Sequence, residues 1–395
     1  MPVRRWILSR LAAGVGLTAM RATVFWQVYD VTKSAGVLGL VGLITFLPAP
    51  FASLAGGMLA DAFDRRRVIQ VAQLCELAAA AALVALSSAA HPSVALLIAL
   101  YVVNGVAVAV EAPSRQAMLP RLVPSEELGR AVTVMSTAQS LAFVSGPALA
   151  GLLLSTVGAR GSYVTGFVLL AISAALVASV RPTEPGTQTR SAIGLAGLRE
   201  GLRYVLGQRA LLGALSVDLF AVIFGGASAM LPVYANDVLA VGARGYGILA
   251  ASLDAGAVLT SLALMTMPPI RRLGRSILLG VVVYGLATIA FAFSRTFALS
   301  IAVYALVGIA DQVSVVGRST LVQLSTPDAL RGRVSSINMI FIMASNQLSV
   351  AESGFVAAMT SPTFSVASGG VGVLVVAAIV ALAAPELWRY RSHSS

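Results

Sequence analysis

The stretch Gly-Met-Leu-Ala-Asp-Ala-Phe-Asp-Arg-Arg-Arg, residues 57–67, decides the fold of this chain. It is a short, arginine-rich turn between two long apolar runs, at about 36–60 and 68–90. Each run has the roughly 20 residues that a helix needs to cross the hydrocarbon of a bilayer. The turn therefore predicts two membrane-spanning helices that meet at one membrane surface.

The same pattern recurs along all 395 residues, which are 58% hydrophobic and only 11% charged. A soluble domain carries about 25% charged residues, so the composition excludes a disordered chain and does not suit a water-soluble enzyme. We expect twelve spans joined by short loops. They are about 6–29, 36–60, 68–90, 93–112, 130–157, 161–180, 210–236, 243–268, 275–293, 296–317, 334–360 and 363–386.

The basic residues predict the orientation of these spans. The loops expected outside hold only Lys33, Arg160, Arg244 and Arg295, and most of the 27 basic side chains lie on the other side. Because cytoplasmic loops are enriched in Lys and Arg, we expect both termini in the cytoplasm and a multi-pass protein of the cell (inner) membrane. The net charge of +11 is then a topology signal and does not indicate a nucleic-acid partner.

The two halves of the chain resemble each other at a constant separation of 203 residues. The corresponding pairs are Arg115 and Arg318, Pro124 and Pro327, Gly129 and Gly332, Arg130 and Arg333, and Gly151 and Gly354. This repeat predicts a bundle at 1–180, a linker with an amphipathic helix at 181–209, and a bundle at 210–395. Parallel repeats of this kind place a substrate site near the membrane midplane.

Residues 57–67 resemble the loop signature of the major facilitator superfamily, Gly-x-x-x-Asp-basic-x-Gly-basic-basic, with Ala62 in place of the first basic residue. Asp64 at the glycine position and Pro-Ser-Arg-Gln-Ala-Met-Leu-Pro at 113–120 are similar to the branch of exporters for enterobactin and macrolides. The resemblance implies an all-α membrane protein with twelve transmembrane helices in two pseudo-symmetric six-helix bundles. It also implies transport by alternating access.

By this resemblance, Asp61, Arg65 and Arg66 form a charge latch at a cytoplasmic gate, with Glu111 as their partner. The alternative is that the arginines only set the topology. The expected gate residues are Gly57, Asp61, Arg65, Arg66, Glu111, Arg115, Arg318 and Arg333. Small residues allow close helix approach, so Gly146, Pro147 and Gly151 predict a tightly packed helix that serves either rocking or packing alone.

Several charged residues fall inside the expected spans. A charge at the bilayer centre costs about 2.5 to 3.5 kcal/mol, so these side chains should face a cavity or a partner. The candidates for substrate or proton coupling are Arg21, Asp218, Asp254, Asp311 and Glu352. In the fold that the chain resembles, spans 1, 4, 7 and 10 line the cavity, which favours Arg21, Asp218 and Asp311. An ion pair is the alternative role of Arg21, and Glu76 is expected to be a structural partner.

The sequence contains no phosphate-binding loop, and its single lysine, Lys33, lies in an expected outer loop. With one cysteine and two histidines, we expect no metal, no cofactor and no enzymatic activity. The predicted function is secondary active transport: proton-driven efflux of small amphipathic molecules, such as drugs or siderophores. Its expected partners are a small-molecule substrate, protons and membrane lipids, and the expected state is a monomer. The alternatives are an importer, a lipid-linked exporter, or a non-transporting receptor or assembly protein in the membrane.

Overall fold

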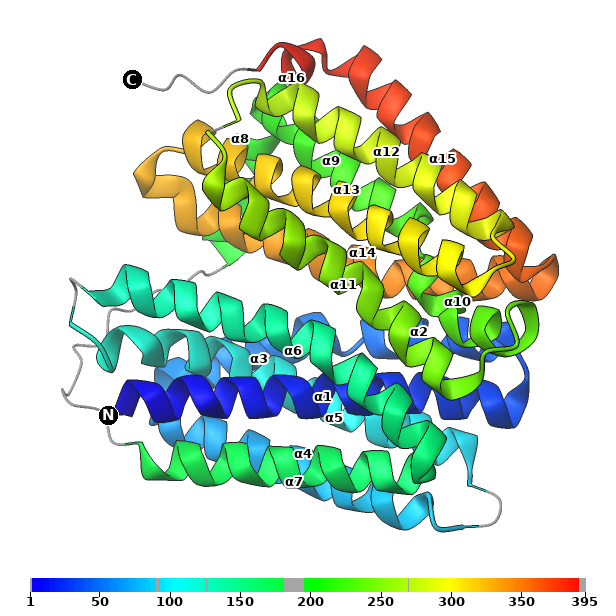
Figure 1. Ribbon diagram of the computed structural model, residues 1–395. Helices are drawn as coiled ribbons and strands as arrows, with labels where there is room; N and C mark the ends of the chain where they lie inside the picture. The colour runs from blue at the N-terminus through cyan, green and yellow to red at the C-terminus, as the bar shows by residue number, and fades with distance from the viewer. Residues whose placement is uncertain (1, 90–91, 125–126, 181–194, 269, 391–395) are drawn as a thin grey trace. The chain divides into compact units, whose positions relative to one another are not determined.

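The computed structural model describes residues 2–89, 92–124, 127–180, 195–268 and 270–390, and within these ranges it is helical without strands. The helices are α1 (Pro2–Thr32), α2 (Ala35–Phe46), α3 (Ala49–Ala62), α4 (Arg65–Leu86), α5 (Val94–Met118), η1 (Leu119–Arg121), α6 (Leu128–Thr156), α7 (Gly158–Ser179), α8 (Leu195–Gly207), α9 (Arg209–Phe224), α10 (Ala227–Val233), η3 (Tyr234–Val238), α11 (Gly242–Thr266), α12 (Leu273–Phe293), α13 (Phe297–Ser325), α14 (Asp328–Met359), α15 (Pro362–Ala383) and α16 (Pro385–Arg389). Figure 1 shows them in chain order by colour. The first part of the predicted linker, 181–194, lies outside the described residues.

Eleven helical stretches in the described part of the chain are long and apolar enough to cross a membrane. Helix α1 is not among them, because Arg10, Arg21 and Gln27 lower its hydropathy. Its 31 residues nevertheless extend about 46 Å at 1.5 Å per residue, which exceeds the roughly 30 Å of hydrocarbon in a bilayer. With α1, the count of long helical stretches is consistent with the twelve spans that the sequence predicts.

Large apolar side chains cover the outer faces of these helices. Met359, Leu382 and Phe51 are 85%, 84% and 73% exposed. A soluble monomer rarely exposes apolar patches of this extent, whereas a bilayer surrounds them with lipid. The prediction of an integral membrane protein is confirmed.

The chain forms two compact units. Unit 1 comprises Met1–Lys33, Ile44–Arg190 and Ala240–Ala251, and unit 2 comprises Ser34–Leu43, Ser191–Leu239 and Ser252–Ser395. Helix α2 therefore begins in unit 2 and ends in unit 1, and α11 does the reverse.

In unit 1, α1 packs along α6 and α7, and α4 packs against α5 and α7 (Figure 1). Asp64 caps the start of α4, and its side chain accepts a hydrogen bond from the backbone N–H of Arg67 at 3.0 Å. Such a cap satisfies one of the N–H groups that a helix start leaves free. Near this end, Trp6, Ile69 and Met118 are packed in one apolar cluster that joins α1, α4 and α5.

In unit 2, α12 packs against α13 and α15, and α9 packs against α14 and α15. Leu211, Ile277, Leu321 and Val373, one from each of α9, α12, α13 and α15, belong to one buried cluster. This apolar packing surrounds the polar side chains of α9 and α13 described below.

Pairs of glycines allow close helix crossings at equivalent places of the sequence repeat. In unit 1, a Cβ on Gly151 of α6 would lie 2.6 Å from the Cα of Gly247 on α11. In unit 2, Gly354 of α14 meets the backbone of Gly39 on α2 just as closely. Any side chain larger than hydrogen would push these helices apart.

Candidate functional site

Each unit buries a group of charged side chains. The unit 1 charge cluster consists of Arg10, Glu76, Glu111 and Arg115, from α1, α4 and α5. The unit 2 charge cluster consists of Asp218, Asp254, Asp311 and Arg318, from α9, α11 and α13. Charges inside a membrane protein are costly and mark pathways for substrates or ions, so these two clusters are the candidate functional sites.

The unit 2 charge cluster is centred on an ion pair between two helices. Nη2 of Arg318 on α13 lies 3.2 Å from Oδ1 of Asp218 on α9, and the two residues are 2% and 5% exposed. Nη1 of Arg318 donates to Oδ1 of Asn338 on α14, while Nε has no hydrogen-bond partner among the described residues. Arg318 thus ties three helices together in the interior of unit 2.

Two further carboxylates lie within electrostatic reach of this pair. Asp311, two turns before Arg318 on α13, interacts with the charges of Asp218, Arg318 and Asp254. Both Asp311 and Asp254 are half-buried. Asp218 pairs with Arg318, Asp311 feels the charges of both, and Asp254 acts on Asp311, so the cluster favours the binding of a proton or of another cation.

The unit 1 charge cluster differs because its ion pair lies within one helix. Nε of Arg115 lies 2.8 Å from Oε1 of Glu111, one turn earlier on α5, and Nη2 lies 3.3 Å from Oε2. The guanidinium also stacks on the ring of Trp6 at 5.4 Å. The structure therefore shows Arg115 as the ion-pair partner of the predicted gate residue Glu111.

Arg21 lies on the exposed side of α1, among aromatic side chains of unit 1. Its guanidinium carbon is 5.8 Å from the ring centre of Phe25. Phe25 in turn meets Tyr101 edge-on at 6.1 Å, and Trp26 stacks on Tyr246 at 5.5 Å. An exposed arginine beside aromatic rings can bind an anionic or aromatic ligand.

Glu352, the remaining candidate for coupling, is half-buried on α14. Its Oε2 accepts a hydrogen bond from the hydroxyl of the neighbouring Ser353 at 3.2 Å. Its immediate environment is therefore a hydroxyl group of its own helix.

The arginine turn at 65–67 binds the ends of neighbouring helices. Nη1 of Arg65 donates to the carbonyl of Ala117 near the end of α5 at 3.3 Å, and Nη2 of Arg66 donates to the carbonyl of Ala178 at the end of α7. The last carbonyls of a helix lack partners within it and carry partial negative charge. These two arginines therefore join three helix ends at one level of unit 1.

The other predicted gate residues have separate environments. The side chain of Asp61, in α3, lies outside the described residues, and Gly57 of the same helix has open space at its Cβ position. Arg333 on α14 forms an exposed ion pair with Glu200 on α8, at 2.6 Å between Nη1 and Oε2. This contact holds the second part of the predicted linker, α8, against unit 2.

The predicted packing residues lie at close helix contacts. A Cβ on Gly146 would overlap the side chain of Thr18 on α1, whose hydroxyl donates to the carbonyl of Ala142 at 2.9 Å. The carbonyl of Pro147 lies 2.7 Å from the Cβ position of Gly247. Helix α6 thus presents small residues to both α1 and α11.

Sequence reasoning missed several partners of these charges. Asn338 and Trp6 carry no signal beyond their residue type, because only the fold brings them to Arg318 and Arg115. Arg10 gave a usable signal, since it interrupts the apolar run of α1. Its half-buried charge acts on Glu76, Glu111 and Arg115.

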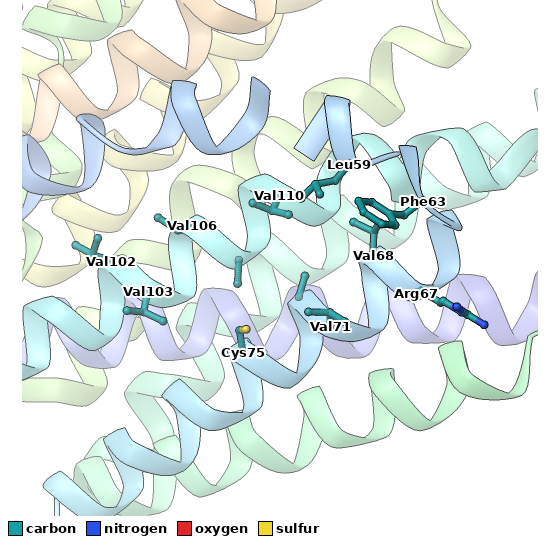
Figure 2. A pocket seen from close by; sticks show the side chains of 12 residues that line it. Leu59, Phe63, Arg67, Val68, Val71, Cys75, Val102, Val103, Val106 and Val110 are labelled. Carbon is teal, nitrogen blue, oxygen red and sulfur yellow. The ribbon is translucent and has the colours of Figure 1, made fainter. Parts of the chain in front are cut away.

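A groove of about 470 Å³ lies elsewhere on unit 1, between α3, α4 and α5. Figure 2 shows valines 71, 102, 103, 106 and 110 along it, with the guanidinium of Arg67 at one end. None of the predicted site residues lines it. An apolar groove on a helix face of a membrane protein suits a lipid chain better than a polar cargo.

The fold defines the class of protein. Residues along 98% of the chain superpose on a bacterial homologue of the human lysosomal transporter Spinster, with a TM-score of 0.76, 14% identity and 96% of that chain covered. The nucleoside transporter NupG gives a TM-score of 0.69 at 14% identity, with 98% of both chains covered. The protein has the fold of major facilitator transporters, with twelve long helical stretches as the sequence predicts.

Sequence comparison then gives the family. The chain belongs to the transmembrane secretion effector family, whose model matches residues 3–392. It is similar to the enterobactin exporter EntS of Shigella boydii serotype 4 (strain Sb227), with 27% identity over 393 residues, which cover 98% of this chain and 93% of that protein. The same exporter from Escherichia coli O1:K1 / APEC has the same identity and coverage.

Proposed function

We propose that this transporter exports small amphipathic molecules against their concentration gradient and that a proton gradient drives this export. It works by alternating access in the cell (inner) membrane, with both termini in the cytoplasm. The observation that supports it best is the buried Asp218–Arg318 pair with Asp311 and Asp254 beside it. The similarity to enterobactin exporters favours outward transport of siderophore-like compounds.

Charge balance in the unit 2 charge cluster supports proton coupling. Asp218 and Asp311 share the charge of Arg318 and leave excess negative charge when both are ionised, and a buried excess charge is unfavourable. A proton on Asp218 would reduce the excess and loosen the hold on Arg318, which would then be kept by Asn338 and its other neighbours. Asp218 is thus the proposed proton acceptor. Asp254 is proposed to assist Asp218 in proton coupling, and Glu352 to contribute less to it.

Arg21 is the proposed contact for the cargo. It is exposed and has aromatic neighbours in Phe25, Tyr101 and Tyr246. A guanidinium offers several N–H donors and stacks on flat rings, which suits a molecule with an anionic group and an aromatic or apolar body.

The gate is proposed to lie at the arginine turn of unit 1. Arg65 and Arg66, at the start of α4, release helix carbonyls when the halves rock, while Asp61 and Gly57 belong to the preceding helix, α3. On this proposal, Glu111 and Arg115 hold the end of α5 firm, and Arg333 holds α8 through Glu200.

The decisive experiment measures efflux from cells that lack their own pumps, with enterobactin, a macrolide and a cationic dye as probes. Expression should accelerate the efflux of at least one probe, an uncoupler should abolish the gain, and Asp218→Asn should remove the dependence on a pH gradient. Accumulation in place of efflux would indicate an importer. Movement of no probe, with normal amounts of protein in the membrane, would favour a non-transporting receptor.

A further inference from the structure

Glu76 is a charged residue that the proposed mechanism does not use. It lies on α4 in unit 1, is 0% exposed, and neither Oε1 nor Oε2 has a hydrogen-bond partner among the described residues. An ionised carboxylate that is buried without donors is strongly unfavourable, and such a group takes up a proton instead. Burial without hydrogen-bond partners therefore favours the neutral form of the Glu76 side chain in this conformation.

The neighbours of Glu76 contain unused donors. The charges that act on it are Glu111 and Arg115 on α5 and Arg10 on α1. Glu111 is already bound by Arg115, but Nη1 of Arg115 is buried and has no acceptor within the described part of the chain. Arg10 likewise forms no hydrogen bond or ion pair there; its interactions are electrostatic.

The other helices packed against α4 are α7 and α3. Helix α7 contributes the hydroxyl of Ser173, which accepts from the side-chain amide of Gln73 at 3.0 Å, one turn before Glu76. The single acidic residue in the sequence of α3 is Asp61, whose side chain lies outside the described residues. The charged surroundings of Glu76 are therefore two arginines with free N–H groups and one carboxylate that is already paired.

We infer that Glu76 is a proton-binding site of unit 1, separate from the unit 2 charge cluster, and that an arginine N–H replaces its proton during transport. On this inference the Glu76 carboxyl is neutral in this conformation, while the side-chain hydrogen bonds of Arg115 go to Glu111. When the O–H bond breaks, the proton passes to water and the electron pair stays on the carboxylate. The carboxylate then captures Nη1 of Arg115 or the guanidinium of Arg10.

This exchange reaches the proposed gate. If Arg115 also donates a hydrogen bond to Glu76, it binds Glu111 less tightly near the end of α5. That end also carries the carbonyl of Ala117 to which Arg65 donates. The inference rests on the proposed function only in linking the proton to transport, because the protonation of Glu76 follows from its burial and lack of partners.

The first test measures the proton directly in the purified full-length protein. Infrared difference spectra across pH should show the C=O stretch of a buried carboxylic acid at neutral pH in the wild type. The band should be absent in Glu76→Gln and unchanged in Glu127→Gln, a control at an exposed glutamate. A band that persists unchanged in Glu76→Gln overturns the inference.

A second measurement keeps the test valid if a variant folds poorly. An amide resembles a protonated carboxyl in shape, so Glu76→Gln should unfold at the same temperature as the wild type near about pH 4, where the glutamate of the unfolded chain is largely protonated as well. The unfolding temperature of the wild type should fall as the pH rises from about 4 toward neutrality, because the unfolded chain releases this proton while the folded protein keeps it, and that of Glu76→Gln should fall less. If Glu76→Gln does not fold, Glu76→Asp should retain the infrared band at a shifted frequency, and its loss there would contradict a proton at this position.

Transport in proteoliposomes, with enterobactin as the probe, links the proton to function. In Glu76→Gln, the acceleration by a pH gradient should be lost, while exchange of labelled for unlabelled probe continues. Full acceleration in Glu76→Gln overturns the coupling role. If the gradient fails to accelerate even the wild type, the proposed function fails, and the infrared result still decides whether Glu76 carries a proton.

Discussion

Arg318 and Asp218 form an ion pair that joins α13 to α9 in the interior of unit 2, with 3.2 Å between Nη2 and Oδ1. The repeat counterpart of Arg318 is Arg115, which pairs with Glu111 on its own helix. Equivalent arginines thus have different ion pairs: that of Arg318 joins two helices, whereas that of Arg115 lies within one helix. Only the pair in unit 2 would release a helix contact if its carboxylate were protonated.

The ion pair between α9 and α13 should be costly to break from one side. Replacing Arg318 with Met leaves Asp218 buried without its cation, which should cost about 3 to 5 kcal/mol of unfolding free energy. Replacing both, as Asp218→Leu with Arg318→Met, should recover most of this loss because no charge remains buried. Denaturation in detergent gives the unfolding free energy of the purified wild type, of Arg318→Met and of the double variant.

The exposed pair of Arg333 and Glu200 provides the control for that cycle. Its side chains are 38% and 57% exposed, so Arg333→Gln should change the unfolding free energy by less than about 1 kcal/mol. Equal losses from Arg318→Met and Arg333→Gln would show that burial does not determine the strength of the unit 2 ion pair.

The glycine crossing of α6 and α11 should not tolerate a methyl group. A Cβ at Gly151 would lie 2.6 Å from the Cα of Gly247, so Gly151→Ala should destabilise the protein by about 1 to 3 kcal/mol through overpacking. Gly105→Ala is the matched control, because nothing lies within 4 Å of its Cβ position. There, the helix propensity of alanine should be neutral or stabilising. Thermal unfolding compares the two, and a Gly151→Ala protein as stable as Gly105→Ala would contradict the close crossing.

The three consecutive arginines should differ in their effect on transport. Arg65 and Arg66 donate to helix-end carbonyls, whereas the side chain of Arg67 is exposed beside the apolar groove. We expect Arg65→Ala and Arg66→Ala to slow the efflux of a transported probe severalfold, and Arg67→Ala to leave it unchanged. Membrane insertion is checked by a C-terminal fluorescent tag. If all three variants transport alike, the arginines serve only to set the topology.

Arg21 should affect the affinity for cargo more than the folding of the protein. A hydrogen bond to a charged group is worth about 1.5 to 3 kcal/mol, so Arg21→Ala should raise the half-saturating concentration of an anionic probe by about ten- to a hundredfold. Arg21→Lys should keep the charge but lose part of the geometry. Efflux rates at varied probe concentration separate this effect from a change in maximal rate. Unaltered half-saturation in both variants would remove Arg21 from the substrate site.

Much of the architecture could be predicted from the sequence. In a membrane, apolar runs of about 20 residues form helices because a helix satisfies the backbone hydrogen-bonding groups within the segment itself. The arginine turn at 57–67 and the repeat of Arg115 and Arg318 also gave the superfamily. Helix α1 shows the limit of hydropathy alone, since Arg10, Arg21 and Gln27 lower its score without ending the helix.

The partners of the charged residues could not be predicted, because they depend on helix rotation and depth. The family resemblance placed Asp218 and Asp311 along one cavity and assigned Arg318 to the cytoplasmic gate. The sequence gave no sign that Arg318 pairs with Asp218 or that Asn338 completes its contacts. Glu76 illustrates the same limit. Its position on a helix that is peripheral in the family suggested a structural role, whereas its complete burial without a donor is visible only in three dimensions.

The crossing of Gly39 and Gly354 affects how the protein is made. Residues 34–43 belong to unit 2, together with α14 near the other end of the chain. During synthesis at about 5 to 20 residues per second, the start of α2 waits on the order of tens of seconds before its partner helix leaves the ribosome. Through that interval, the small-residue face of α2 meets only lipid or the insertion machinery, so unit 2 cannot be completed until translation has almost ended.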